Sequence, residues 1–256
     1  MNTLLDTLAR WRPFKALVVG DFMLDQLVYG NADRLTPEAP VPVLHVQREE
    51  SRPGGAANVC LDLAAMHASV ETFGIVGSDA AGQALRQLLA DAGISAAGIV
   101  EDAARPTTIK RSLIGMAQHR HPQRMFRVDY ESKDAIPAEV ADRLLASFER
   151  ALAGASVVCI EDYNKGVCSE RVCQEVIRLA RRAGVPVLID PAAIGDYTKY
   201  RGATTITPNR AEAALAAGVK IAPDATPIEH ADLAKKLLRD LDLETIVVTL
   251  DRHGAL

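Results

Sequence analysis

The sequence predicts an α/β protein with a doubly wound, mostly parallel sheet, helices on both faces and a small β lid. Three observations predict this class. Short runs made continuously of Val, Ile and Leu are typical of strands buried on both faces. These runs alternate with stretches of helical period, which indicates right-handed crossovers and therefore a parallel sheet. Two segments with alternating polar residues break the pattern and favour a separate β layer.

The individual elements follow from the same patterns. Buried strands are expected at "ALVVG" (16–20), "VETFGIVG" (70–77), "SVVCI" (156–160), "VPVLID" (185–190) and "TIVVTL" (245–250). Helices are expected at 56–66, 80–92, 137–153, 169–183 and 227–241. A chain of 256 residues with 48% hydrophobic residues is sufficient for one large core. We therefore expect residues 1–256 to form a single domain.

The two exceptional segments are residues 26–50 and 105–130, which are strand-like but polar at alternate positions. Proline punctuates the first of them, which is tolerated only in edge or short strands. Such strands do not fit the middle of a buried sheet. We expect them to form a lid over the edge of the sheet, or a surface for a second subunit.

Composition excludes several classes of protein. The formal net charge is −4 and there is no long run of Lys or Arg, which argues against a nucleic-acid partner. No segment is long and apolar enough to cross a bilayer, and residues 1–15 carry charges where a signal peptide would be apolar. Cys60 and Cys159 lie in apolar runs, and none of the four cysteines forms a C-x-x-C pair. They indicate buried free thiols and a cytoplasmic protein.

Polar residues follow the predicted strands, at the edge where open α/β sheets bind ligands. There are five such clusters: Asp21 and Asp25; Asp162 and Lys165; Asp190; Asn209 and Glu212; and Thr249, Asp251 and Gly254. Any one of them has the alternative explanation of a helix cap. Five clusters at one edge of one sheet indicate a binding site.

The stretch "SRPGGAANVC" (51–60) adds a glycine-rich turn before a predicted helix. Gly54 and Gly55 can adopt conformations closed to other residues and let a ligand approach the main chain. The helix expected from Ala56 presents free N–H groups there, and Asn58 offers both a donor and an acceptor. A polyhydroxylated sugar needs this mixture, but a tight turn capped locally by Asn58 explains the stretch equally well.

Other chemistries are not indicated. The sequence contains no G-x-S-x-G nucleophile motif, no H-E-x-x-H zinc motif and no G-x-x-x-x-G-K-[ST] phosphate loop. No G-x-G-x-x-G follows the first strand.

The motifs "PGGAANV", "VVGDFMLD", "SDAAG", "EDYNKG", "IDP" and "TPNRAE" together resemble the ribokinase-like (PfkB) carbohydrate kinase family, and the resemblance covers essentially the whole chain. Within the family, "RLTPEAPVPV" (34–43) is similar to the subgroup that phosphorylates D-glycero-D-manno-heptose 7-phosphate at the anomeric hydroxyl for ADP-heptose and lipopolysaccharide synthesis. In that subgroup the kinase is often fused to an adenylyltransferase. The resemblance implies a kinase that uses ATP and Mg²⁺, and a homodimer formed through the lid.

The resemblance also implies residue roles. Asp21, Gly54, Gly55 and Asn58 match positions that hold sugar hydroxyls, and Asp25 and Asp162 join them as candidate substrate ligands. Candidates for the anionic end of a sugar phosphate are Lys110, Arg124, Arg127 and Lys165. The residues matched to the nucleotide are Asp190, the N-x-x-E motif Asn209, Arg210, Ala211 and Glu212, and the turn with Thr249, Asp251 and Gly254. Glu212 would contact the metal through water.

One family motif is absent. D-T-x-G-A-G-D, which supplies the catalytic base and an anion hole in the family, does not occur in these 256 residues, so the catalytic residue is unknown. We expect most of a sugar-phosphate kinase domain, cut short at its C-terminus. The alternatives are a kinase for another sugar or a nucleoside, and a catalytically inactive binding or dimerising module.

Overall fold

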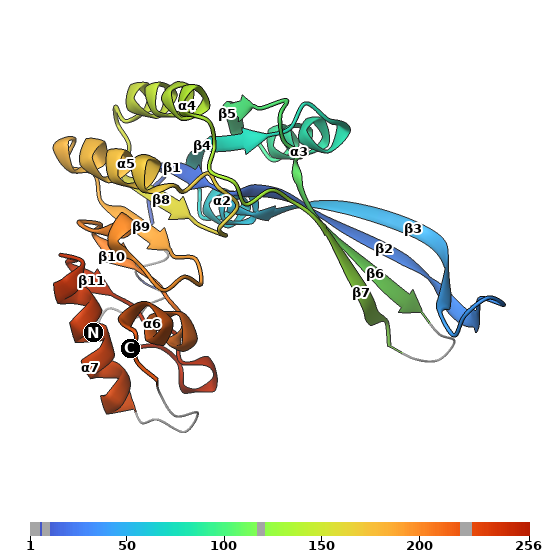
Figure 1. Ribbon diagram of the computed structural model, residues 1–256. Coiled ribbons are helices and arrows are strands. Elements are labelled where there is room, and N and C mark those ends of the chain that lie inside the picture. Colours follow the sequence, from blue (N-terminus) through green and yellow to red (C-terminus); the bar gives the residue numbers. More distant parts are fainter. Residues whose placement is uncertain (1–5, 7–10, 117–120, 221–226) are drawn as a thin grey trace.

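The computed structural model describes residues 6, 11–116, 121–220 and 227–256. Within this part of the chain, seven parallel strands form the central sheet in the order β11-β10-β9-β8-β1-β4-β5 (Figure 1). The strands are β1 (Phe14–Gly20), β4 (Ala68–Val76), β5 (Ser95–Glu101), β8 (Val157–Glu161), β9 (Val187–Asp190), β10 (Thr205–Ile206) and β11 (Thr245–Ile246). The predicted fold class is confirmed.

Helices pack on both faces of this sheet because its strands are apolar on both sides. Leu17 and Val19 of β1 belong to the core beneath α4 (Ala138–Ala151) and α5 (Glu170–Arg182). Val18 points the other way, into the core beneath α2 (Ala56–Ala65) and α3 (Ala80–Asp91). The remaining helical elements are α6 (Arg210–Ala217), α7 (Pro227–Asp240) and the short 3₁₀ turns η1 (Thr198–Tyr200) and η2 (Asp251–His253).

A second sheet projects from this body as a long arm (Figure 1). Its four described strands are ordered β3-β2-β6-β7, with β2 (Phe22–Leu35), β3 (Pro42–Gly55), β6 (Thr108–Met116) and β7 (Gln123–Tyr130). The two exceptional segments therefore do form a separate β layer. Their predicted bounds were wrong at the root, because β2 begins directly after β1 and β3 continues to Gly55. Residues 117–120 of the second segment lie outside the described residues.

The register of the arm gives its two faces different chemistry. Asp25 pairs with Arg52 of β3 and with Lys110 of β6, so these charged residues share one face. Val28 pairs with Leu113, which in turn pairs with Phe126, on the opposite face. We call this opposite side the apolar lid face; its apolar members are Val28, Ile109, Leu113, Phe126, Val128 and Tyr130. Arg111 and Gln26, which are hydrogen-bonded to each other at 2.8 Å, lie on the same face.

Two further expectations can be compared with the structure. All four cysteines are free and buried, as predicted. None of the described helices combines the length and apolarity required to cross a membrane.

Candidate active site

The carboxyl ends of the central strands meet at one edge of the sheet. Gly20 is in register with Glu161, and Glu161 is in register with Asp190. A cleft of about 330 Å³ opens above this edge, lined by Lys133, residues 162–165, residues 190–193 and Glu212. The structure therefore brings together polar residues from three of the five predicted strand-end clusters.

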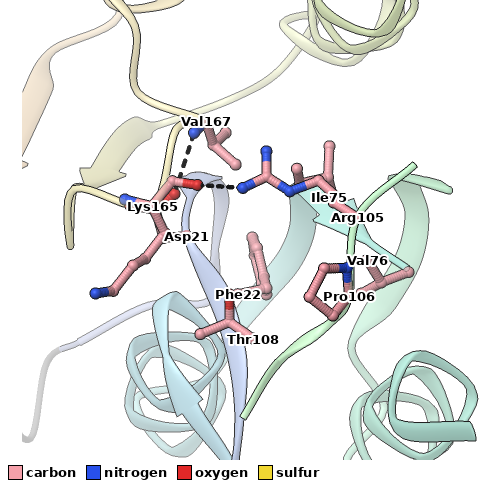
Figure 2. A pocket seen from close by; sticks show the side chains of 9 residues that line it. All are labelled: Asp21, Phe22, Ile75, Val76, Arg105, Pro106, Thr108, Lys165 and Val167. Atoms are coloured by element: carbon pink, nitrogen blue, oxygen red, sulfur yellow. Dashed lines mark hydrogen bonds between the residues drawn. The ribbon is translucent and has the colours of Figure 1, made fainter. Parts of the chain in front are cut away.

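Asp21 lies at this edge but is buried. Its carboxylate accepts hydrogen bonds from the backbone N–H groups of Tyr163 (2.8 Å), Lys165 (3.0 Å) and Val167 (3.2 Å), and the last contact is visible in Figure 2. Burial, and the nearby charge of Asp162, raise the pKa of Asp21 despite these three donors. Asp21 thus holds the loop after β8 in place. Its predicted contact with a sugar hydroxyl stays a prediction.

The glycine pair has a specific steric reason. A Cβ on Gly54 would lie 2.6 Å from Cγ of Asp25, so only glycine leaves room for that carboxylate. Gly55 has φ +56°, and a Cβ there would lie 2.7 Å from the backbone oxygen of Asp21. Oδ1 of Asp25 is buried and, among the described residues, has no hydrogen-bond partner. An unpaired buried carboxylate oxygen is costly, and a ligand hydroxyl would satisfy it.

Asn58 lies in the first turn of α2, exposed to solvent, where its Nδ2 donates to Oδ2 of Asp62 at 3.3 Å. The helix begins at Ala56 as predicted, and its N-cap is Gly55 with no side-chain cap. Asn58 is therefore not the local cap that was the alternative explanation of this stretch. Its amide is held by one weak contact along the helix.

Asp162 is the centre of a buried polar network that sequence reasoning missed. Its Oδ2 lies 2.7 Å from the Tyr200 hydroxyl and 2.5 Å from Nζ of Lys199, while its Oδ1 accepts from the backbone of Asn164 at 2.7 Å. The Tyr200 hydroxyl also accepts from the backbone N–H of Ala192 at 3.1 Å. The network joins the loops after β8 and β9, so it shapes both walls of the cleft.

The basic residues predicted to bind the anionic end of a sugar phosphate differ in burial and in their distance from the cleft. Nζ of Lys165 pairs with Glu131 at 2.6 Å, and both side chains are largely buried. Nζ of Lys110 lies 5.3 Å from the centre of the Tyr163 ring, beside the cleft. Arg127 pairs with Asp129 on the exposed strand β7, and Arg124 is exposed further along it. The register places Arg127 on the same lid face as Lys110, but neither arginine lines the cleft.

The residues matched to the nucleotide form one cluster around the start of α6. The Asn209 side chain accepts from the N–H groups of Ala211 (2.9 Å) and Glu212 (3.0 Å), and Oε2 of Glu212 accepts from the Asn209 N–H (2.9 Å). This is a capping box. The backbone of Arg210 donates to Thr249, and its guanidinium pairs with Asp251 at 2.8 Å. Gly254, with φ +84°, closes this turn onto Leu250.

Carboxylates crowd the sheet edge, and one of them was not singled out from the sequence. Glu161 is 6% exposed at the end of β8, where burial, and the charge of Asp190, raise its pKa to about 8. Burial, and the charge of Glu212, raise the pKa of Asp190. Concentrated negative charge and oxygen donors are what a hydrated Mg²⁺ requires. Glu212 uses only one carboxylate oxygen in its capping box, so its other oxygen remains available to a metal-bound water.

A second group with metal-ligand atoms is Asp162, Cys168 and Cys173, whose ligand atoms lie within 4.8 Å of one another. The ammonium of Lys199 already occupies the Asp162 carboxylate, and a hydrogen bond that the Cys168 thiol donates to Cys173, together with burial, raises the pKa of Cys168. A protonated thiol beside an ammonium disfavours a cation. These residues are a structural network.

The model of the pfkB family carbohydrate kinases matches residues 14–256. The D-beta-D-heptose 7-phosphate kinase of Bordetella bronchiseptica is 42% identical over 241 residues, covering 94% of this chain and 72% of that protein. The bifunctional protein HldE of Wolinella succinogenes is 40% identical over 238 residues, covering 93% of this chain and 48% of that protein. The chain thus spans about half the length of the bifunctional relative.

Solved structures show the same fold. Phosphofructokinase-2 from Escherichia coli, in complex with fructose-6-phosphate, superposes with a TM-score of 0.74 at 18% identity, covering 95% of this chain and 76% of that one. At this identity the likeness establishes the fold alone.

Proposed function

The chain belongs to the pfkB family of carbohydrate kinases, and on that premise we propose that it binds D-glycero-D-manno-heptose 7-phosphate and directs its anomeric hydroxyl to Mg–ATP in the synthesis of ADP-heptose. The similarity to heptose 7-phosphate kinase supports this substrate, because it extends over 94% of the chain. The four buried free thiols favour a reducing compartment, in keeping with a cytoplasmic enzyme.

One structural observation carries the proposal. The Asp25 carboxylate lies against Gly54 at the root of the lid with a buried oxygen that no described residue satisfies. A sugar hydroxyl is the right donor for it, since a carboxylate accepts strongly from hydroxyl groups. Asn58, in the first turn of the adjoining helix α2, would provide an amide for a second hydroxyl.

The far end of the sugar phosphate would lie toward Lys165 and Lys110. Lys165 lines the cleft from the loop after β8, and Lys110 lies on the lid next to Tyr163, which lines the cleft. A phosphate group would compete with Glu131 for the Lys165 ammonium, because it carries more charge than the carboxylate it displaces. The site would then bind phosphorylated sugars more tightly than unphosphorylated ones, because only a phosphate group would take the place of Glu131 beside the Lys165 ammonium.

The nucleotide would lie along the opposite wall of the cleft. The turn that joins Asn209, Thr249 and Gly254 provides backbone groups there, and Asp190 and Glu212 face the same space. Bound Mg²⁺ would bridge phosphate oxygens and neutralise the charge that develops during transfer. The contribution of Glu212 is to orient water toward the metal, while its capping-box bond fixes the start of α6.

Substitution of the sugar ligands tests this proposal. Asp25→Asn and Asn58→Ala should each weaken binding of heptose 7-phosphate by about 5- to 150-fold, because each leaves a hydroxyl or its partner unsatisfied, a loss of about 1–3 kcal/mol. Binding of Mg–ATP should be unchanged. Titration calorimetry with both ligands measures this, and Asp33→Asn, at an exposed position on the same strand as Asp25, is the matched control. Equal losses for sugar and nucleotide would contradict the assignment.

We further propose an isologous dimer through the apolar lid face. Phe126 is 64% exposed and Tyr130 46% exposed on this face, at the same side of β7 and separated by Val128. Exposed large apolar side chains on one face of a sheet can mark an interaction surface. Pairing with the same face of a second copy would bury both and protect the edge strands of the arm.

Sedimentation at tens of micromolar should therefore find a dimer. Phe126→Glu should weaken the dimer by about 30-fold or more, since a central aromatic at an interface commonly contributes 2 kcal/mol or more. Leu215→Glu is the control, because Leu215 is a comparably exposed apolar residue (50%) on α6. A wild-type monomer at these concentrations would overturn this part of the proposal.

A further inference from the structure

Arg105 joins three segments of the chain at the root of the lid. Its guanidinium donates to the backbone oxygens of Lys165 (2.7 Å), Ser132 (3.0 Å) and Asp134 (3.3 Å). Figure 2 shows the contact with Lys165, directly beside the bond between Val167 and Asp21. The three segments are residues 105–107, which lead into β6 and which we call the strap, the segment that follows β7, and the loop after β8.

The strap that carries Arg105 is itself fixed to the body. The backbone N–H of Thr107 donates to Oδ2 of Asp79 at 2.8 Å, and the Thr107 hydroxyl donates to Oδ1 at 2.7 Å. Asp79 also caps α3 through the N–H of Gly82 at 2.8 Å. The backbone that carries Arg105 is therefore held to the body, so its guanidinium can fix the position of the segments that it contacts.

The loop after β8 depends on contacts of this kind. Val167 and Cys168 anchor the end of this loop in the core, and its N–H groups at Tyr163, Lys165 and Val167 all donate to the Asp21 carboxylate. Gly166 has φ +93°, and a Cβ there would lie 1.9 Å from the backbone oxygen of Asp134. Arg105 thus adds a contact at the root of the lid to those that Asp21, Asp162 and the core make with this loop, and no side chain fits at Gly166.

The position of Lys165 follows from these contacts of the loop. Its ammonium pairs with Glu131 at 2.6 Å, and Glu131 directly follows β7, the last lid strand. Arg105 holds the backbone oxygen of the same Lys165 and the segment next to Glu131. One planar guanidinium, with five donors in fixed geometry, thereby sets the backbone on both sides of this ion pair.

We propose that Arg105 is a positioning residue for the sugar-phosphate end of the site: it fixes the backbone that presents Lys165 and ties that backbone to the root of the lid. This inference rests on the proposed function. Arg105 does not need to touch the substrate, because it acts only through backbone carbonyls. Lysine cannot replace it, since an ammonium cannot span the three carbonyls in one plane.

Calorimetric titration of heptose 7-phosphate into variants of the full 256-residue chain tests the inference. Arg105→Met should raise the Kd for heptose 7-phosphate by about 10- to 50-fold and leave that for Mg–ATP within about twofold. Arg86→Met is the matched control, because Arg86 also donates to two backbone oxygens, of Ile99 (2.9 Å) and Ala96 (3.2 Å), but these belong to the edge strand β5 and not to the loop after β8. It should change neither Kd. Arg105→Lys keeps the charge and most of the aliphatic side chain and should raise the Kd as Arg105→Met does. It takes the place of Arg105→Met in the titrations if Arg105→Met does not fold.

A double-mutant cycle separates positioning from a general loss of structure. Lys165→Met should itself weaken heptose 7-phosphate binding, and adding Arg105→Met should then cost less than about threefold more, because both changes remove the same contact. Hydrogen exchange should show faster exchange at the amides of residues 163, 165 and 167 in Arg105→Met only.

The possible failures are distinguishable. Wild-type protein that binds no heptose 7-phosphate would overturn the proposed function and the role of Lys165 with it. Wild-type binding that Arg105→Met leaves unchanged, or fully additive losses in the cycle, would overturn the role of Arg105 alone.

Discussion

A protein consisting of these 256 residues should form ADP from Mg–ATP and heptose 7-phosphate at less than about 10⁻³ per second, although kinases of this kind typically reach about 1–100 per second. The reason is the absence of G-A-G-D from the sequence. Loss of a general base typically costs about 10²–10⁴ in rate, and loss of an anion hole about 10²–10³, without strict additivity.

We expect that none of the following carboxylates at the sheet edge acts as the catalytic base. Asp21 is held by three backbone N–H groups, and Asp162 is occupied by Lys199 and Tyr200. Glu161 is buried, with its pKa raised to about 8 by that burial and by Asp190. Asp25 has a free oxygen, but the proposed function uses it to hold a sugar hydroxyl.

Coupled measurement of ADP release by the purified chain, with and without heptose 7-phosphate, tests this prediction. Turnover near one per second would show that the base lies within these residues, and its loss in Asp25→Asn would identify Asp25. Binding without turnover is the expected result.

The second large effect concerns Glu161 and pH. Its pKa is raised from 4.5 to about 8 in the folded chain, primarily by burial and then by the charge of Asp190. The folded state therefore binds this proton more tightly than the unfolded state. The resulting stabilisation is fully present below about pH 4.5, decreases as the pH rises, and is lost once the pH passes about 8. At about 1.4 kcal/mol for each pKa unit, the change amounts to about 3–5 kcal/mol.

Comparison of wild type with Glu161→Gln isolates this effect. The glutamine has nearly the same shape and cannot ionise, so the free energy of unfolding of wild type should fall relative to that of the variant by about 3–5 kcal/mol between pH 5 and pH 9. Urea denaturation across this range measures the difference. A difference that stays constant with pH would show that Glu161 is ionised in the folded chain at neutral pH.

Elements with strong local patterns were predictable from the sequence. The continuous apolar run of β1 and the period of α5, which buries Val172, Cys173, Val176, Ile177 and Ala180, gave bounds within about two residues. The strand β5 was not predicted, because "SAAGIVE" has small residues where a strand signal needs β-branched or aromatic ones. The strand expected at 245–250 was too long: only Thr245 and Ile246 pair, and Thr249 then bridges to Asn209.

The residues of the site were likewise predictable only in part from the sequence. Strand-end positions identified Asp162, Asp190 and Glu212 as neighbours, since parallel strands align their carboxyl ends. What each side chain contacts depends on distant parts of the chain. Asp21 meets an amide 142 residues away, Asp162 meets Tyr200 at a separation of 38, and Arg105 meets Lys165 at a separation of 60. No local pattern encodes such pairs, so Arg105, Lys199 and Tyr200 were not singled out.

The central claim is that this chain holds a sugar-phosphate site between the lid root and the loop after β8. Titration calorimetry of the wild-type chain with heptose 7-phosphate, and with the same heptose lacking its phosphate, tests it most directly. We predict one site per chain with a Kd between about 1 μM and 1 mM, the usual range for enzyme substrates. The unphosphorylated sugar should bind at least about tenfold more weakly, because it makes no ion pair with Lys165. No binding of the sugar phosphate, or equal binding of both sugars, would contradict the account.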